Sequence, residues 1–196
     1  MLTVLSAPRH PLVEHALRQA RQWCAGQVID ERPALAHAVR VALVLGRYVT
    51  DAAPELIAAA LLHDAPEFAP SHVDLDLILG RRYGAEVARI VRAVEVAHHA
   101  LESAAPIIAV EDLPVLLVCT ADKIVALESL LLRAGTSGDV EGFFAARPGL
   151  LRLLPHFRAF CAAALGRVPP GMSVRLDQVL QEMAEATTTT VRARTA

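Results

Sequence analysis

The sequence contains no asparagine, few aromatic residues and few turn-forming residues between its long runs of alanine, leucine and arginine. Aromatic side chains make up only 4% of the 196 residues, although 54% are hydrophobic. A buried core must therefore consist mainly of Ala, Leu and Val. Alanine and leucine are among the strongest helix formers, so these scarcities argue against a β-rich domain and favour an all-α protein.

The chain also has no large excess of positive or negative charge, since the formal net charge is −2 and the pI is about 6.4. A nucleic-acid-binding surface normally requires a basic patch, which this charge balance does not supply. The three cysteines form no CxxC pair, as is typical of reduced thiols in a cytoplasmic protein. No signal peptide is evident, and the most apolar window, residues 113–132, contains three charged residues. We therefore expect a cytoplasmic protein that binds neither nucleic acid nor membrane.

Apolar residues recur with helical spacing through most of the chain. The pattern predicts about seven to eight helices, at residues 10–25, 33–49, 54–64, 73–83, 85–100, 115–134, 148–165 and 173–186. No linker is long enough to divide these helices, so residues 1–186 are expected to form a single domain. Residues 187–196 lack apolar periodicity and are expected to be a disordered tail.

Residues 58–67 carry the most informative pattern, because an apolar helical run ends there in His63 and Asp64, with Glu67 one turn later. Burying an imidazole beside a carboxylate costs several kcal/mol unless a nearby cation compensates. His63 and Glu67 are four residues apart, so on a continued helix their side chains would emerge on one face, ~6 Å apart. The alternative is an ordinary helix end, where the histidine interacts with the helix dipole and both acids face water.

Two further residues are polar in apolar helical contexts. His37 lies on the apolar stripe of its helix, where a lone histidine is more often a core residue with a hydrogen-bond partner than a ligand. Asp122 lies in the middle of the most apolar helix, where an unpaired carboxylate is costly. A surface pair with Lys123 is the alternative, but adjacent helical residues do not face each other. His98 and His99 close another helix and are interpreted as dipole-stabilising residues, not as ligands.

Together, His37, His63, Asp64 and Asp122 offer two imidazoles and two carboxylates from three different helices. This donor set suits one first-row divalent ion with positions left open for water and substrate. Mn²⁺ is expected first, with Fe, Co, Zn or Ni as alternatives.

The order H…HD…D on helices resembles that of the HD-domain metal-dependent phosphohydrolases. The finer likeness is to the RelA/SpoT-type (p)ppGpp hydrolase domain and the small stand-alone alarmone hydrolases, and it spans roughly residues 10–183. Four segments carry it. Two of them contain the predicted ligands His37, His63 and Asp64: VIDERPALAHAVRVA (28–42) resembles the family pattern R-K-D-G-x-P-Y-x-x-H-P-x-x-V-A, and AALLHDAPEFA (59–69) resembles A-A-L-L-H-D-x-x-E-D-T-x. The other two are YGAEVARIV (83–91), which resembles F-G-x-x-V-A-x-L-V, and TADK (120–123), which resembles L-A-D-K/R and contains Asp122.

The resemblance implies an HD-domain fold and a phosphohydrolase that acts on a nucleotide or a related phosphorylated small molecule. In this interpretation Glu67 is the general acid or base, and Asp64 is catalytic as well as a metal ligand. Lys123 and Arg40 are candidate phosphate contacts. The sequence leaves homo-oligomerisation open.

At four positions the chain departs from the alarmone hydrolases, while all four metal positions are kept. The polar residues that the family carries there are replaced by Val28, Ala34, Phe68 and Ala126. We therefore expect altered substrate contacts. A single acid at this point is also similar to the HD-type 5′-nucleotidases. The remaining alternative is a non-catalytic, metal-containing module that binds a nucleotide or a protein partner.

Overall fold

The computed structural model describes residues 4–102 and 111–193 and is built almost entirely of helices. The α-helices are α1 (Pro11–Trp23), α2 (Ala34–Tyr48), α3 (Pro54–Leu62), α4 (Ala65–Phe68), α5 (Leu75–Tyr83), α6 (Ala85–His99), α7 (Leu113–Ser137), α8 (Val140–Ala145), α9 (Pro148–Ala164) and α10 (Pro170–Ala193). A 3₁₀ turn (Ala100–Glu102) follows α6, and the strands β1 (Val28–Ile29) and β2 (Arg32–Pro33) form one short antiparallel pair. The prediction of an all-α fold is confirmed.

Of the ten α-helices in the described residues, eight correspond to the eight segments predicted from helical periodicity, and α4 and α8 are additional short helices. The connection between α7 and α8 is short, because α7 continues to Ser137 and α8 begins at Val140, with the Asp139 side chain accepting a hydrogen bond from the Gly142 amide. The last helix, α10, continues to Ala193 and so extends over most of the segment for which a disordered tail was expected.

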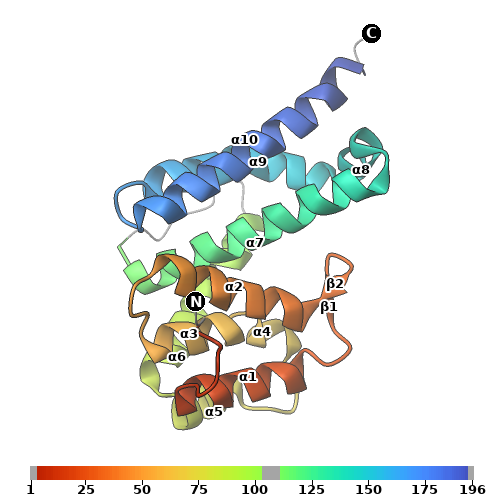
Figure 1. Ribbon diagram of the computed structural model, residues 1–196. Helices are drawn as coiled ribbons and strands as arrows, with labels where there is room; N and C mark the ends of the chain where they lie inside the picture. Colours follow the sequence, from red (N-terminus) through yellow and green to blue (C-terminus); the bar gives the residue numbers. More distant parts are fainter. Residues whose placement is uncertain (1–3, 103–110, 194–196) are drawn as a thin grey trace.

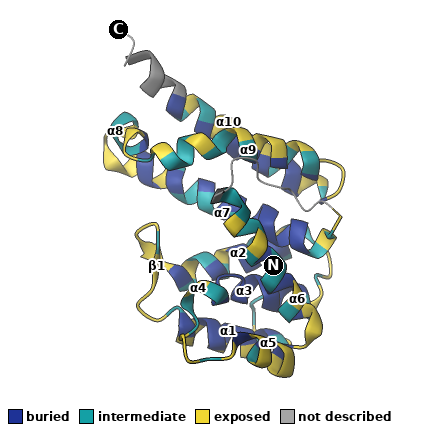
Figure 2. Ribbon diagram, turned by 180° about the vertical axis from the view of Figure 1, so that it is seen from behind, coloured by how far each residue is buried: buried dark blue, intermediate teal, exposed yellow. Residues whose placement is uncertain are grey.

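Helix α3 is the centre of the fold. Its residues from Leu56 to Leu62 are all buried, because α1, α2, α6 and α7 pack around it. In Figure 1, the long helix α7 runs through the middle of the molecule. Helices α9 and α10 lie on one side of it, and α2, α3 and α1 lie on the other. Figure 2 shows that the buried residues gather on the facing sides of these helices. Because α3 is buried, the residues that directly follow it, His63 and Asp64, also lie in the interior of the molecule.

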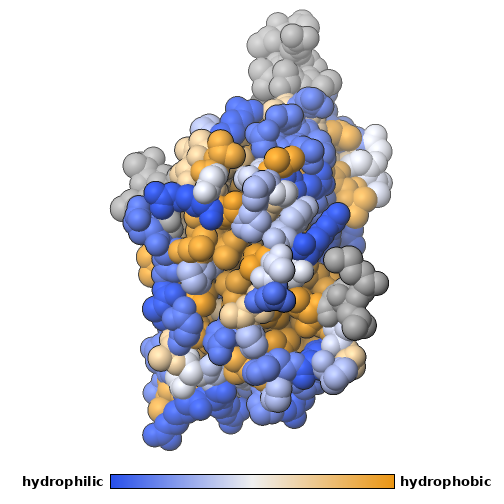
Figure 3. Space-filling model, turned by 60° about the vertical axis from the view of Figure 1, so that its left-hand side comes forward, coloured by the Kyte–Doolittle hydropathy of each residue, from blue (hydrophilic) through white to orange (hydrophobic). Residues whose placement is uncertain are grey.

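Apolar side chains also remain at the surface, among them Val28, Val96 and Leu165. One face has an apolar centre bordered by hydrophilic side chains (Figure 3). Among the described helices, none combines the length and the apolar character that a membrane span requires.

The strand pair forms a hairpin between α1 and α2, in a segment where helical periodicity predicted no helix. Its two turn residues, Asp30 and Glu31, both have positive φ angles, of 45° and 65°. Arg133 on α7 holds this turn, because its guanidinium donates to the Asp30 carboxylate, to the Asp30 carbonyl and, at 2.6 Å, to the Glu31 carboxylate. The hairpin is thereby fixed against α7, and it leads directly into α2.

Replacing Arg133 by methionine is expected to lower the free energy of unfolding by about 1.5–3 kcal/mol, the usual value for a hydrogen bond to a charged group. The Arg133 side chain is only 8% exposed, so its guanidinium is largely removed from water, although the Asp30 and Glu31 side chains are 43% and 76% exposed. Arg89→Met is the matched control, because Arg89 also pairs with two carboxylates but is 44% exposed and should contribute less. Urea unfolding of both variants measures the difference. Equal losses would show that Arg133 does not hold the hairpin.

Candidate metal centre and adjoining pocket

The four residues singled out for metal binding come together at the centre of the fold. His37 lies in α2, His63 and Asp64 form the junction between α3 and α4, and Asp122 lies in α7. Because α2, α3 and α7 pack against one another, these side chains converge although 85 residues separate His37 from Asp122.

The distances within this cluster are those of donors that surround a small cation. His37 Nε2 lies 3.0 Å from Asp122 Oδ1, and His63 Nε2 lies 3.2 Å from Asp64 Oδ1 and 3.8 Å from Asp122 Oδ1. One donor atom each from His37, His63 and Asp64 lies within 4.8 Å of the others. Ligands bound at about 2.1 Å to one ion are separated by about 3.0–4.2 Å, depending on the angle between the bonds.

His63 is oriented as a metal-ligating histidine would be. Its Nδ1 lies 2.8 Å from the Ala60 carbonyl oxygen, so this nitrogen carries the hydrogen and donates it. The Nε2 lone pair then faces the carboxylates, and such a backbone contact is the usual way in which proteins fix the tautomer of a ligand.

The polar atoms at the centre of the cluster lack other partners. His63 Nε2 and Asp64 Oδ2 are buried and have no hydrogen-bond partner among the described residues. A buried polar atom without a partner costs about 1–3 kcal/mol, and coordination to a cation would remove that cost. The residues present therefore fit a divalent metal ion.

The electrostatics of the cluster favour positive charge at its centre. Burial alone lowers the pKa of His63, but the negative charges of Asp64 and Asp122 outweigh it and raise this pKa to about 9. Burial alone raises the pKa of Asp122, but its contacts with His37, His63 and His98 hold this pKa well below its usual range.

His98 is a member of the cluster that sequence reasoning set aside. Its Nε2 atom lies 3.4 Å from Asp122 Oδ2, and its ring centroid lies 5.9 Å from that of His63. The sequence does contain a signal for this placement, since Val87, Val91 and Val94 are buried and His98 continues the same helical stripe. His99, one residue later, is exposed.

The other residues predicted for the site lie in three different environments. Glu67 is exposed on α4, one turn after His63. Arg40 is half-exposed on α2, with Nη2 4.0 Å from Glu128 Oε2. Lys123 is buried, and its ammonium lies 4.5 Å from the ring centroid of Phe160 on α9. The charged end of Lys123 therefore faces α9, and Lys123 is not among the residues that line the pocket beside the cluster.

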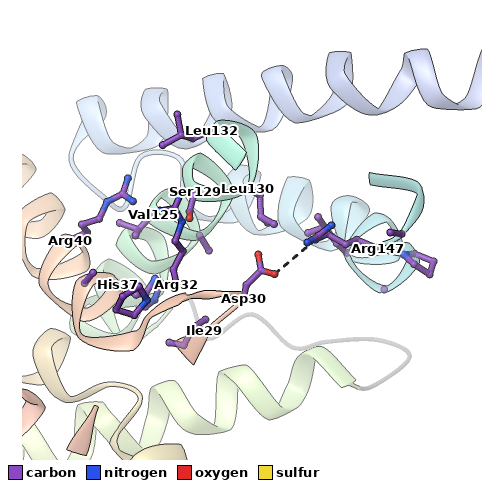
Figure 4. Close-up of a pocket in the computed structure, with 17 residues that line it drawn as sticks. Ile29, Asp30, Arg32, His37, Arg40, Val125, Ser129, Leu130, Leu132 and Arg147 are labelled. Carbon is purple, nitrogen blue, oxygen red and sulfur yellow. Dashed lines mark ion pairs between the residues drawn. The ribbon is translucent and has the colours of Figure 1, made fainter. Parts of the chain in front are cut away.

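A pocket of about 580 Å³ adjoins the cluster through His37. Figure 4 shows Arg32 and Arg40 on the same side of the pocket as His37, and Arg147 on the opposite side, where it pairs with Asp30. The backbone of Arg32 belongs to the β1–β2 pair, but its guanidinium has no ion pair or hydrogen bond to any residue that the structure describes. The remaining lining is largely apolar and comes from the hairpin, α7 and the start of α9, with Ile29, Pro33, Val125, Ala126, Leu130, Leu132, Pro148 and Leu150.

Comparison with known proteins places this site in context. Residues 16–137, which contain all four predicted ligands, match the family described as HD domain. Among solved structures, the chain is similar to a metazoan ortholog of SpoT that is described as hydrolysing ppGpp and playing a role in starvation responses. The two share a TM-score of 0.66 and 16% sequence identity, over 91% of this chain and 98% of that one. This likeness shows a shared fold. No curated protein sequence matches the chain.

Proposed function

Because the chain belongs to the HD-domain family, we propose that it is a metal-dependent phosphohydrolase that acts on a nucleotide or a related phosphorylated small molecule. One observation carries this proposal. His37 is at once part of the His/Asp cluster and part of the lining of a pocket that contains three arginines. Arg32 and Arg40 lie on the His37 side of this pocket, so a phosphate that they bind would lie beside the cluster.

In this proposal His37, His63, Asp64 and Asp122 hold one divalent ion. Imidazole and carboxylate donors together suit Mn²⁺, and they also suit Fe, Co, Ni or Zn. When bound, such an ion lowers the pKa of a water molecule and neutralises charge on a phosphate oxygen. The protein supplies the orientation, since Ala60 fixes the His63 ring and the packing of α2 and α7 fixes His37 and Asp122.

The pocket supports a substrate with a phosphate at one end and a flat or apolar group at the other. Guanidinium groups bind phosphate oxygens through two parallel hydrogen bonds, and Arg32 and Arg40 are the arginines on the His37 side. The apolar residues of α7 and α9 then offer a surface for a base and sugar. A volume of about 580 Å³ is within the usual range for pockets that take small molecules.

Glu67 is proposed as the residue that transfers the proton during hydrolysis. It follows the His63–Asp64 pair by one turn and has no ion pair or hydrogen bond through its side chain among the described residues, so its carboxylate is available to a water or a leaving group. Asp64 is proposed to orient the attacking water in addition to its role as a ligand. Lys123 is left out of this proposal because its ammonium faces Phe160.

Arg40→Met is expected to raise KM for the substrate about ten- to a hundredfold, with a smaller effect on kcat. A charge-assisted contact to phosphate contributes roughly 1.5–3 kcal/mol, which corresponds to that change in affinity. Arg81→Met is the control, because Arg81 is exposed on α5 and does not line the pocket. Steady-state kinetics of both variants test the assignment, and a wild-type KM in Arg40→Met would remove Arg40 from the substrate site.

The alarmone ppGpp is expected to be a poor substrate, with kcat/KM below about 10⁴ M⁻¹s⁻¹, the low end of ordinary enzyme efficiency. Ala126 lines the pocket without a polar group, Ala34 is fully buried, and Val28 is 62% exposed with no group that can bind phosphate. Rates for ppGpp, nucleoside monophosphates and NADPH at saturating Mn²⁺ provide the comparison. If ppGpp is the best substrate and exceeds that value, the four substitutions do not alter specificity.

The same assay tests the proposed function as a whole. The full chain is incubated with a panel of nucleotides, once with added Mn²⁺ and once with EDTA. Hydrolysis of at least one nucleotide that EDTA abolishes supports the phosphohydrolase. Bound nucleotide without hydrolysis under any metal condition supports a non-catalytic HD module instead.

A further inference from the structure

His98 presents a buried nitrogen that nothing in the described structure satisfies. Its Nε2 atom has no hydrogen-bond partner among the described residues, although it lies 3.4 Å from Asp122 Oδ2. The contact is within hydrogen-bond distance but does not have hydrogen-bond geometry. A buried imidazole nitrogen left in this way costs about 1–3 kcal/mol.

The two oxygens of Asp122 face different histidines. Oδ1 lies near His37 and His63, whereas Oδ2 lies near His98. The separation of 3.4 Å between His98 Nε2 and Asp122 Oδ2 is within the range of about 3.0–4.2 Å expected for two donors to one ion. In the described part of the chain, three buried side-chain atoms have no hydrogen-bond partner, and all three belong to this one cluster: His63 Nε2, Asp64 Oδ2 and His98 Nε2.

We infer that His98 Nε2 is a fifth protein ligand of the ion that His37, His63, Asp64 and Asp122 hold, an inference that rests on the metal site of the proposed function. Three imidazoles with two carboxylates make a donor set that favours Mn, Fe, Co, Ni or Zn over Mg. α6 thereby becomes the fourth structural element of the metal centre, beside α2, α7 and the junction between α3 and α4.

The test uses Co²⁺ as the probe and the full chain stripped of metal with chelator. Wild type is expected to bind one Co²⁺ per chain, and His98→Ala to weaken that binding by on the order of 10²-fold, a usual share for one ligand of four or five. His99→Ala is the matched control, because His99 is the exposed neighbour of His98 in the same helix turn. Circular dichroism of the metal-free variants verifies that each remains folded.

A cysteine at position 98 separates a direct ligand from a residue that only positions Asp122. A thiolate bound to Co²⁺ gives an intense near-ultraviolet charge-transfer band, so His98→Cys should acquire this band. Wild type and His99→Cys, which contain the same three native cysteines, should not. Absence of the band in His98→Cys, or wild-type Co²⁺ affinity in His98→Ala, overturns the inference. Failure of the wild type itself to bind Co²⁺ would instead overturn the metal site of the proposed function.

Discussion

Glu67→Gln is expected to lower the turnover number by on the order of 10²-fold or more, the usual contribution of a general acid or base. The substitution keeps the size of the side chain and removes only its ability to exchange a proton. Because Glu67 is exposed and its side chain forms no ion pair or hydrogen bond with the described residues of the cluster, the fold and the metal content should be unchanged.

The control for this variant is Glu55→Gln, because Glu55 lies in the first turn of α3, at the end of that helix away from His63. It makes the same chemical change away from the cluster and should leave turnover at the wild-type value. Metal analysis accompanies the kinetics of both proteins. Unchanged turnover in Glu67→Gln rejects the catalytic role, and loss of metal from that variant would make Glu67 a ligand.

Asp122→Asn is expected to weaken metal binding by on the order of 10²-fold and to reduce activity in proportion to the metal lost. Structural zinc sites with four ligands have apparent binding free energies of about 10–16 kcal/mol, so one ligand contributes roughly 3 kcal/mol. Asp122 also carries negative charge that His37, His63 and His98 surround, and the amide of asparagine does not replace that charge.

The effect on stability gives this prediction a second readout. A ligand present at 100 times its Kd stabilises the folded state by about 2.7 kcal/mol, so Mn²⁺ should raise the Tm of the wild type. The rise should largely disappear in Asp122→Asn and persist in Asp76→Asn, which removes an exposed carboxylate on α5. The same Mn²⁺-induced rise in all three proteins would contradict the role of Asp122.

The sequence was sufficient to predict the all-α fold and the convergence of four polar residues, for a reason that is visible in α3. A continuous apolar run is costly to expose, so it predicts the central buried helix, and the His63–Asp64 pair at its end must then lie in the interior. The same reasoning applies to Asp122, which lies within the apolar helix α7.

Other parts of the site depend on how helices pack, which local sequence does not reveal. Lys123 is adjacent to Asp122 but points toward α9, because neighbouring helical residues face different directions. His98 was assigned to the helix dipole, although its continuation of the buried valine stripe of α6 indicated an interior position. The hairpin before α2 depends on Arg133, a residue about 100 positions later, and no local pattern predicts that contact.

The most direct test of the account is a titration of metal-free protein with Mn²⁺ while phosphate release from the best nucleotide of the panel is followed. The account predicts that the rate rises in proportion to bound metal and saturates at one ion per chain. In Asp122→Asn, saturation should require far more Mn²⁺. A rate that is unchanged by removal of metal, or the absence of phosphate release at full metal occupancy, would contradict a metal-dependent phosphohydrolase.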